Sequence, residues 1–169
     1  PFALLGFFIA VGLHNYPFEW KVFLIVILCM VFARNSAMGL NRYADRKMDA
    51  KNPRTANREI PSGVLKARSA LVFTVVNSAL FIFATWFLNP LCFYLSPIAL
   101  LVVLGYSYTK RFTAWCHLIL GLGLAIAPIG AYLAVSGQFH WFPMLLSGLV
   151  ITWVSGFDVI YALQDEQFD

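Results

Sequence analysis

Two long stretches without charge constrain this chain most. Positions 69–109 contain no Asp, Glu, Lys or Arg, and neither do positions 112–157. A helix that spans a bilayer needs roughly 20 mostly apolar residues, so each stretch is long enough for two spans. Only 12% of the 169 residues are charged, whereas soluble domains carry about 25%. The chain is therefore predicted to be a multi-pass membrane protein.

The expected fold class is all-α, a transmembrane helical bundle in one domain over residues 1–169. Helices satisfy their own backbone groups in lipid, and the sequence lacks the alternation typical of a membrane barrel. Six helical segments are predicted, over residues 1–13, 20–40, 68–88, 91–108, 114–135 and 141–164. The first is too short to span fully and begins without Met. We therefore expect the sequence to be cut at its start, inside a first helix.

Basic residues gather on one side of this predicted topology. Eight of the twelve Lys and Arg residues lie between positions 42 and 68, and Lys110 and Arg111 follow the fourth segment. Loops rich in Lys and Arg stay in the cytoplasm. The expected location is a prokaryotic inner membrane with these loops on the cytoplasmic side. The net charge of +4 then reflects topology or an anionic ligand and does not require nucleic acid.

A first carboxylate cluster follows the second apolar segment. Asn41, Asp45 and Asp49 are spaced four residues apart, which places them on one face of a helix. Two like charges at this spacing destabilise an isolated helix. A solvated helix end, neutralised by the neighbouring basic residues, is one explanation. A bound cation is the other.

A second cluster with the same spacing ends the sequence. It comprises Tyr161, Asp165 and Asp169, with Asp158 one turn earlier, and it contains no Lys or Arg. Ion pairing within the cluster therefore cannot explain its acids, and carboxylates near a membrane are functional hypotheses by default. The topology brings both clusters to the same membrane face. Oxygen ligands of this kind suit Mg²⁺, which commonly bridges carboxylates to a phosphate.

The basic loop supplies groups that suit such a phosphate. Arg54 and Arg58 lie between the first cluster and the turn at residues 61–63, and Lys110 and Arg111 lie in the next cytoplasmic loop. Arginine matches phosphate geometry with a planar fork, and lysine adds a point charge. The alternative is a topology signal that contacts lipid headgroups.

These motifs together resemble the UbiA superfamily of intramembrane prenyltransferases. Residues 41–49 match its NxxxDxxxD motif, residues 158–169 match DxxYxxxDxxxD, and residues 106–111 resemble its YxxxKR loop. Residues 54–63 resemble its RTANRPLPSG loop, with Glu59-Ile60 in place of the commoner Pro-Leu. The resemblance implies a bundle of about nine helices around a cavity. This sequence would then be helices one to six, truncated at both ends and inactive alone.

The resemblance implies Mg²⁺-dependent transfer of a polyprenyl group from polyprenyl diphosphate to a small aromatic acceptor. Residues 33–38 and 156–158 look most like quinone-pathway members, whose acceptors are 4-hydroxybenzoate or dihydroxynaphthoates in ubiquinone or menaquinone biosynthesis. The implied metal ligands are Asn41, Asp45, Asp49, Asp165 and Asp169. The implied diphosphate-binding residues are Arg54, Arg58, Lys110 and Arg111. The implied catalytic residues are Asp158, Tyr161 and Arg111, with Arg34 and Asn57 as substrate-orienting groups.

Other functions stay open. Haem O, chlorophyll and tocopherol synthases share the same pattern. CDP-alcohol phosphotransferases are disfavoured, because their acids lie in one short run. A transporter with ion-binding carboxylates would place them near the bilayer midplane, whereas here they lie at helix ends.

The remaining residues with metal-binding or redox potential show no such pattern. His14, His117 and His140 share no ligand spacing and are interpreted as interfacial or packing residues. The three cysteines lie in or beside apolar segments and are interpreted as small packing residues.

Overall fold

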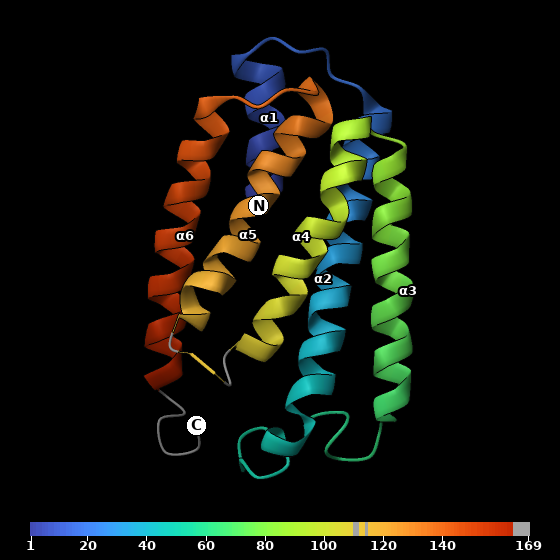
Figure 1. Cartoon of the computed structure of the whole chain (residues 1–169), viewed down its shortest axis with the longest axis vertical. Coiled ribbons are helices and arrows are strands. Elements are labelled where there is room, and N and C mark those ends of the chain that lie inside the picture. The colour runs from blue at the N-terminus through green and yellow to red at the C-terminus, as the bar shows by residue number, and fades with distance from the viewer. Residues whose placement is uncertain (110–111, 114, 164–169) are drawn as a thin grey trace.

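The computed structural model describes residues 1–109, 112–113 and 115–163. In this part of the chain the regular structure is six α-helices (Figure 1). They are α1 (Phe2–Leu13), α2 (Trp20–Asp49), α3 (Ala67–Trp86), α4 (Pro90–Thr109), α5 (Cys116–Ser136) and α6 (Trp141–Ala162). Helices α2 to α6 are long and apolar enough to cross a membrane, and α1 is shorter. The prediction of an all-α, multi-pass membrane bundle is confirmed.

The helices run alternately up and down the bundle (Figure 1). Helix α5 packs against α1, α4 and α6, whereas α2 packs against α3 and α4. Helix α4 therefore joins the two groups. The α2–α3 loop, the connection from α4 to α5 and the carboxyl end of α6 all lie at one end (Figure 1). We call this the motif end, since both sequence motifs reach it.

Helix α2 extends further than its apolar segment. The predicted segment stops at residue 40, whereas α2 continues to Asp49. The other predicted boundaries agree with the helices to within two residues. At 1.5 Å per residue, the 30 residues of α2 cover about 45 Å, against a bilayer core of about 30 Å. Hydropathy marks the edge of the lipid, but the helix continues until the turns around Pro53, so the first motif lies on an extension of a span.

Neutral polar side chains and a glycine join α2 to α3. The Asn35 amide donates to the Asn77 side-chain oxygen at 3.1 Å, and Ser78 donates to the Ser36 hydroxyl at 3.2 Å. A Cβ added to Gly39 would lie only 2.6 Å from the Thr74 hydroxyl. Small residues let helices approach closely in membranes, and hydrogen bonds between them add modest stability.

Histidine and tyrosine side chains cluster at the end opposite the motifs. His14 Nδ1 and the Tyr132 hydroxyl are 2.8 Å apart, and the His14 and His140 rings lie 4.1 Å apart between centroids. His140 also accepts a hydrogen bond from the backbone N–H of Phe142 at the start of α6. These two histidines connect α1, α5 and α6, in agreement with the packing role predicted for them.

Candidate functional site

The first motif lies on one face of α2, and both of its acids are buried. Asp45 is 4% exposed and Asp49 is 6% exposed, and Asn41 lines a cavity beside them. Carboxylates avoid burial unless other groups compensate their charge. The helix extension therefore carries buried acids, and the explanation of a solvated helix end does not hold for them.

The α2–α3 loop folds back onto these acids. Arg58 donates to Asp49 Oδ1 at 2.7 Å, and the Thr55 hydroxyl donates to the Asp49 carbonyl oxygen at 3.1 Å. One residue further, Glu59 lies 3.7 Å from Arg42 Nε. The loop thus returns a predicted diphosphate-binding arginine to the acid motif, although nine residues separate Arg58 from Asp49 in the sequence.

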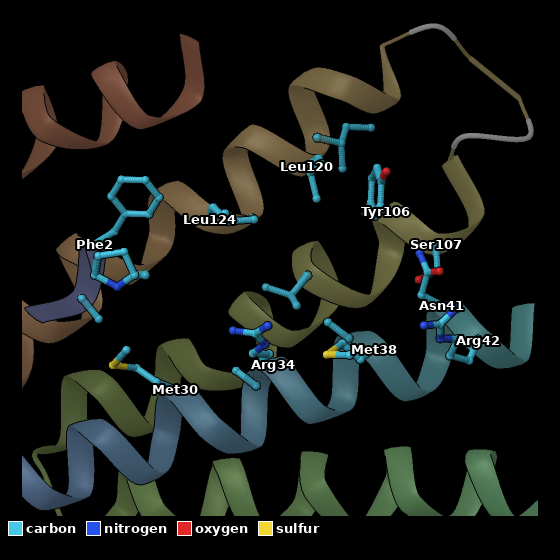
Figure 2. Close-up of a pocket in the computed structure, with 18 of the residues that line it drawn as sticks. Phe2, Met30, Arg34, Met38, Asn41, Arg42, Tyr106, Ser107, Leu120 and Leu124 are labelled. Atoms are coloured by element: carbon cyan, nitrogen blue, oxygen red, sulfur yellow. The ribbon is translucent and has the colours of Figure 1, made fainter. Parts of the chain in front are cut away.

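A cavity of about 580 Å³ opens between α1, α2, α4 and α5. Its walls are mostly apolar, with Met30 and Met38 from α2 and Leu120 and Leu124 from α5 (Figure 2). The lining polar side chains are Arg34, Asn41, Arg42, Arg58, Tyr106 and Ser107. An apolar pocket with a few converging polar groups is the usual form of a ligand site.

Arg34 lies on the same α2 stripe, seven residues before Asn41. Figure 2 shows its guanidinium reaching into the space between α2 and α5, away from the cluster formed by Asn41, Arg42 and Tyr106. Within the described part of the chain, no hydrogen bond or ion pair holds this guanidinium. At about 1.5 Å per residue it lies roughly 10 Å deeper along α2 than Asn41. A cation at this depth marks a functional hypothesis.

The second motif begins with a hydrogen-bonded acid. Asp158 Oδ2 lies 2.8 Å from His117 Nδ1, and the two side chains are 23% and 24% exposed. Tyr106, which lines the cavity, interacts with Asp158 electrostatically and also lies near Asp45. Tyr106 thus lies within electrostatic range of one acid from each motif.

The interpretation of His117 as an interfacial or packing residue did not include its hydrogen bond to an acid of the second motif. A search for metal-ligand spacing could not find it, since 41 residues separate it from Asp158. The sequence offered one indication of this contact. Asp158 lies in a segment without Lys or Arg, so a hydrogen-bond donor from another helix was to be expected, and His117 lies at the start of the neighbouring helix.

Some predicted site residues lie away from the cavity. Tyr161 is 52% exposed and lies beside Phe157, with ring centroids 5.0 Å apart and the ring planes tilted by 41°. Arg54 and Asn57 are exposed in the α2–α3 loop, and neither lines the cavity. Their roles remain predictions. Four further predicted residues lie outside the described part of the chain: Lys110, Arg111, Asp165 and Asp169.

The described half of the site suits a hard divalent cation. Asp49 Oδ2 is buried and has no hydrogen-bond partner among the described residues, although its other oxygen accepts from Arg58. Mg²⁺ prefers oxygen ligands such as carboxylates and keeps several waters. Within the described ranges, no three His, Cys, Asp or Glu side chains come together as a metal group. The described residues would thus contribute one helix face, with Asn41, Asp45 and Asp49, to a magnesium site.

Comparison with known proteins assigns these features to one family. Residues 1–169 match the sequence profile of the UbiA prenyltransferase family. The 4-hydroxybenzoate octaprenyltransferase of Aliivibrio salmonicida is 36% identical over 152 residues, which cover 89% of this chain and 53% of that protein. The enzyme of the same name from Tolumonas auensis is 35% identical over 147 residues, 86% of this chain and 51% of that protein. The chain thus spans about half the length of these curated relatives.

Solved structures show the same fold. A UbiA homolog from Aeropyrum pernix, solved without ligand, superimposes with a TM-score of 0.86 and 31% identity, over 97% of this chain and 62% of that one. A UbiA homolog from Archaeoglobus fulgidus, bound to DMAPP and Mg²⁺, has a TM-score of 0.73 and 21% identity, over 100% of this chain and 62% of that one. At this lower identity the second likeness concerns the fold.

Proposed function

Since the chain belongs to the UbiA prenyltransferase family, we propose that it transfers a polyprenyl group from polyprenyl diphosphate to an aromatic acid. The observation that carries the proposal is the pair of buried acids, Asp45 and Asp49, on the helix face that continues from the cavity residue Asn41, together with Arg58, which lines the cavity and bonds Asp49. An apolar chamber that ends in acids and arginines suits a ligand with a hydrocarbon tail and an anionic head. The likeness to 4-hydroxybenzoate octaprenyltransferases supports 4-hydroxybenzoate as the acceptor, and a dihydroxynaphthoate is the other candidate.

The residues at the motif end would bind the diphosphate. Arg58 lines the cavity and donates a hydrogen bond to Asp49. An incoming diphosphate would compete with Asp49 for the Arg58 guanidinium. Arg54, Lys110 and Arg111 would add positive charge from the two motif-end loops. When C1–O of the allylic substrate breaks, both bonding electrons leave with the diphosphate. Positive groups placed where this negative charge develops lower the barrier.

Magnesium would be held by Asn41, Asp45 and Asp49 of the first motif and by Asp165 and Asp169 of the second. When bound, it would neutralise diphosphate charge and improve the leaving group. The buried Asp49 Oδ2 fits this role, since it lacks a hydrogen-bond partner within the described ranges.

The cavity walls would protect the allylic cation that remains. Met38, Leu120 and Leu124 line the cavity between α2 and α5, and such apolar walls would exclude water during the reaction. A ring carbon of the acceptor supplies the electron pair for the new C–C bond. The ring then regains its aromaticity by losing a proton, or carbon dioxide where the pathway requires decarboxylation.

Arg34 would hold the carboxylate of the aromatic acid. It lines the cavity, and no partner in the described chain competes for its guanidinium. An arginine fork matches a carboxylate with two parallel hydrogen bonds. Asp158, one of the implied catalytic residues, interacts with Tyr106 and is not among the residues that line the cavity, so we propose that its role is to orient other groups. For Tyr161 and Asn57 we propose substrate contact on the basis of their motif positions alone.

We further propose that the motif end faces the cytoplasm of a prokaryotic inner membrane. The basic residues of the α2–α3 loop lie at this end (Figure 1), and basic loops are retained in the cytoplasm.

The test uses the full-length protein in membrane vesicles. Pyrophosphate release and the mass of the lipid product are measured with Mg²⁺, a polyprenyl diphosphate, and either 4-hydroxybenzoate or a dihydroxynaphthoate. The substitutions Asp45→Ala and Asp49→Ala should each lower kcat at least about a hundredfold, the scale of losing a charge-stabilising group. Glu19→Ala, which removes an exposed acid at the other end of α2, is the matched control and should retain activity.

Different results point elsewhere. Prenylation of an acceptor that is not an aromatic acid would favour the haem O or chlorophyll type of prenyltransferase. Magnesium binding through Asp45 and Asp49, with no product from any acceptor, would overturn the proposal in favour of an ion-binding transporter.

A further inference from the structure

The contact between His117 and Asp158 lies outside the cavity but close behind its wall. His117 is the second residue of α5, and Asp158 lies one turn before the end of α6. Their 2.8 Å contact is part-buried. An ionised carboxylate can only accept hydrogen bonds, so His117 is the donor through Nδ1–H.

Helices α5 and α6 pack closely beside this contact. The Ser155 hydroxyl donates to the His117 carbonyl oxygen at 3.0 Å. A Cβ added to Gly121 would lie 2.8 Å from the Ile151 carbonyl oxygen, so the two helices approach closely at this point. The two helix backbones are therefore held close together beside the His117–Asp158 contact.

Tyr106 connects this pair to the cavity. It lines the cavity from α4, near Asn41 (Figure 2), and it interacts with the Asp158 carboxylate. Hydrogen bonds in ligand-free sites are often loose and tighten when the ligand binds. Because Asp158 can only accept, the Tyr106 hydroxyl must turn its hydrogen towards Asp158 to bond with it.

That orientation determines what Tyr106 offers to a ligand. A hydroxyl that gives its hydrogen to Asp158 keeps oxygen lone pairs for an incoming donor. The cavity at Tyr106 would then favour an O–H group and discriminate against a ligand without one. Arg34 lines the same cavity at another point along α2, so a carboxylate and a hydroxyl could be recognised separately.

We propose that His117 is a positioning residue for the aromatic acceptor. It fixes the Asp158 carboxylate, Asp158 orients the Tyr106 hydroxyl, and Tyr106 accepts a hydrogen bond from a phenolic hydroxyl of the acceptor. This inference rests on the proposed function, and it adds the group that selects phenols among aromatic acids.

The test compares ligands that differ only in hydroxyl groups. Binding of 4-hydroxybenzoate and of benzoate to the full-length protein is measured with Mg²⁺ and a non-reactive prenyl diphosphate analogue. The pair 1,4-dihydroxy-2-naphthoate and 2-naphthoate is measured in the same way. The affinity ratio within a pair isolates the hydroxyl contribution, because both members carry the carboxylate.

His117→Leu should reduce this ratio about tenfold, the scale of one hydrogen bond, with benzoate binding unchanged. His117→Asn, which places an amide N–H near the position of Nδ1, should retain the ratio. Tyr106→Phe should reduce it as His117→Leu does. His140→Leu, at the opposite end of the bundle, is the matched control and should leave it unchanged.

Two results would overturn the inference while leaving the proposed function intact: a ratio unchanged in His117→Leu, or a ratio lost in His117→Asn as well, in a protein that still prenylates an aromatic acid. If the wild-type protein binds neither pair and forms no aromatic product, the proposed function fails first and the inference fails with it.

Discussion

Helix α2 carries polar residues on two faces, and the two faces differ in whether these residues have hydrogen-bond partners. Towards α3, Asn35 and Ser36 are neutral and hydrogen-bond Asn77 and Ser78. Towards the cavity, Arg34 is charged and has no hydrogen bond or ion pair within the described residues. The first face satisfies its polar groups inside the protein, whereas the second leaves a charge available to something else.

The difference separates helix packing from ligand binding. Hydrogen bonds between membrane helices contribute modestly, on average about 0.6 kcal/mol. An uncompensated charge in a membrane protein is costly, so its retention indicates a function outside stability. Changes on the cavity face should therefore alter activity more than stability, and changes on the α3 face should do the reverse.

The largest effect is expected at Arg34. Arg34→Met should lower kcat/KM for the aromatic acid about 30- to 100-fold, because a charge-assisted hydrogen bond is lost. The melting temperature in detergent should stay the same or rise, since an unpaired charge is removed. Arg34→Lys should recover only part of the activity. A large fall in melting temperature would instead mean that Arg34 is a packing residue.

An intermediate effect is expected at Gly39. Gly39→Leu should destabilise the protein by about 1–3 kcal/mol, because the added side chain meets Thr74 on α3. Thermal unfolding would measure this loss. Activity per folded molecule should change little, and Gly12→Leu, where a Cβ would meet no neighbour, is the matched control. A change in acceptor preference would break the separation between the two faces.

The smallest effect is expected at the amide pair on the α3 face. Asn35→Leu and Asn77→Leu should show a coupling energy of about 0.6 kcal/mol in a double-mutant cycle of unfolding. Kinetic constants for the acceptor should not change. A coupling near zero would show that close packing alone joins α2 to α3.

Much of this architecture could be predicted from local sequence. The uncharged stretches set the number of spans, and basic loops set which helix ends share a face. The four-residue spacing of Asn41, Asp45 and Asp49 placed them on one helical face. The end of α2 could not be predicted in the same way, because hydropathy indicates where the lipid ends and not where the helical hydrogen bonds end.

Other features depend on how helices rotate and pack. Arg58 meets Asp49 because the loop folds back, and His117 meets Asp158 because α5 and α6 approach closely at Gly121. Neither pairing has a spacing signature. Tyr161 illustrates the converse, since its motif position suggests a substrate contact while the structure places its ring beside Phe157 on an exposed surface.

The spans and the two acid motifs were thus readable in the chain, because each depends on hydrophobicity or periodicity within one segment, whereas the membrane orientation stays a prediction from the basic loops. The cavity, the access of Arg34 to it and the partners of Asp158 depend on side chains from several helices. Their positions follow from interhelical contacts between residues far apart in sequence, and local patterns carry no information about the rotation of one helix against another.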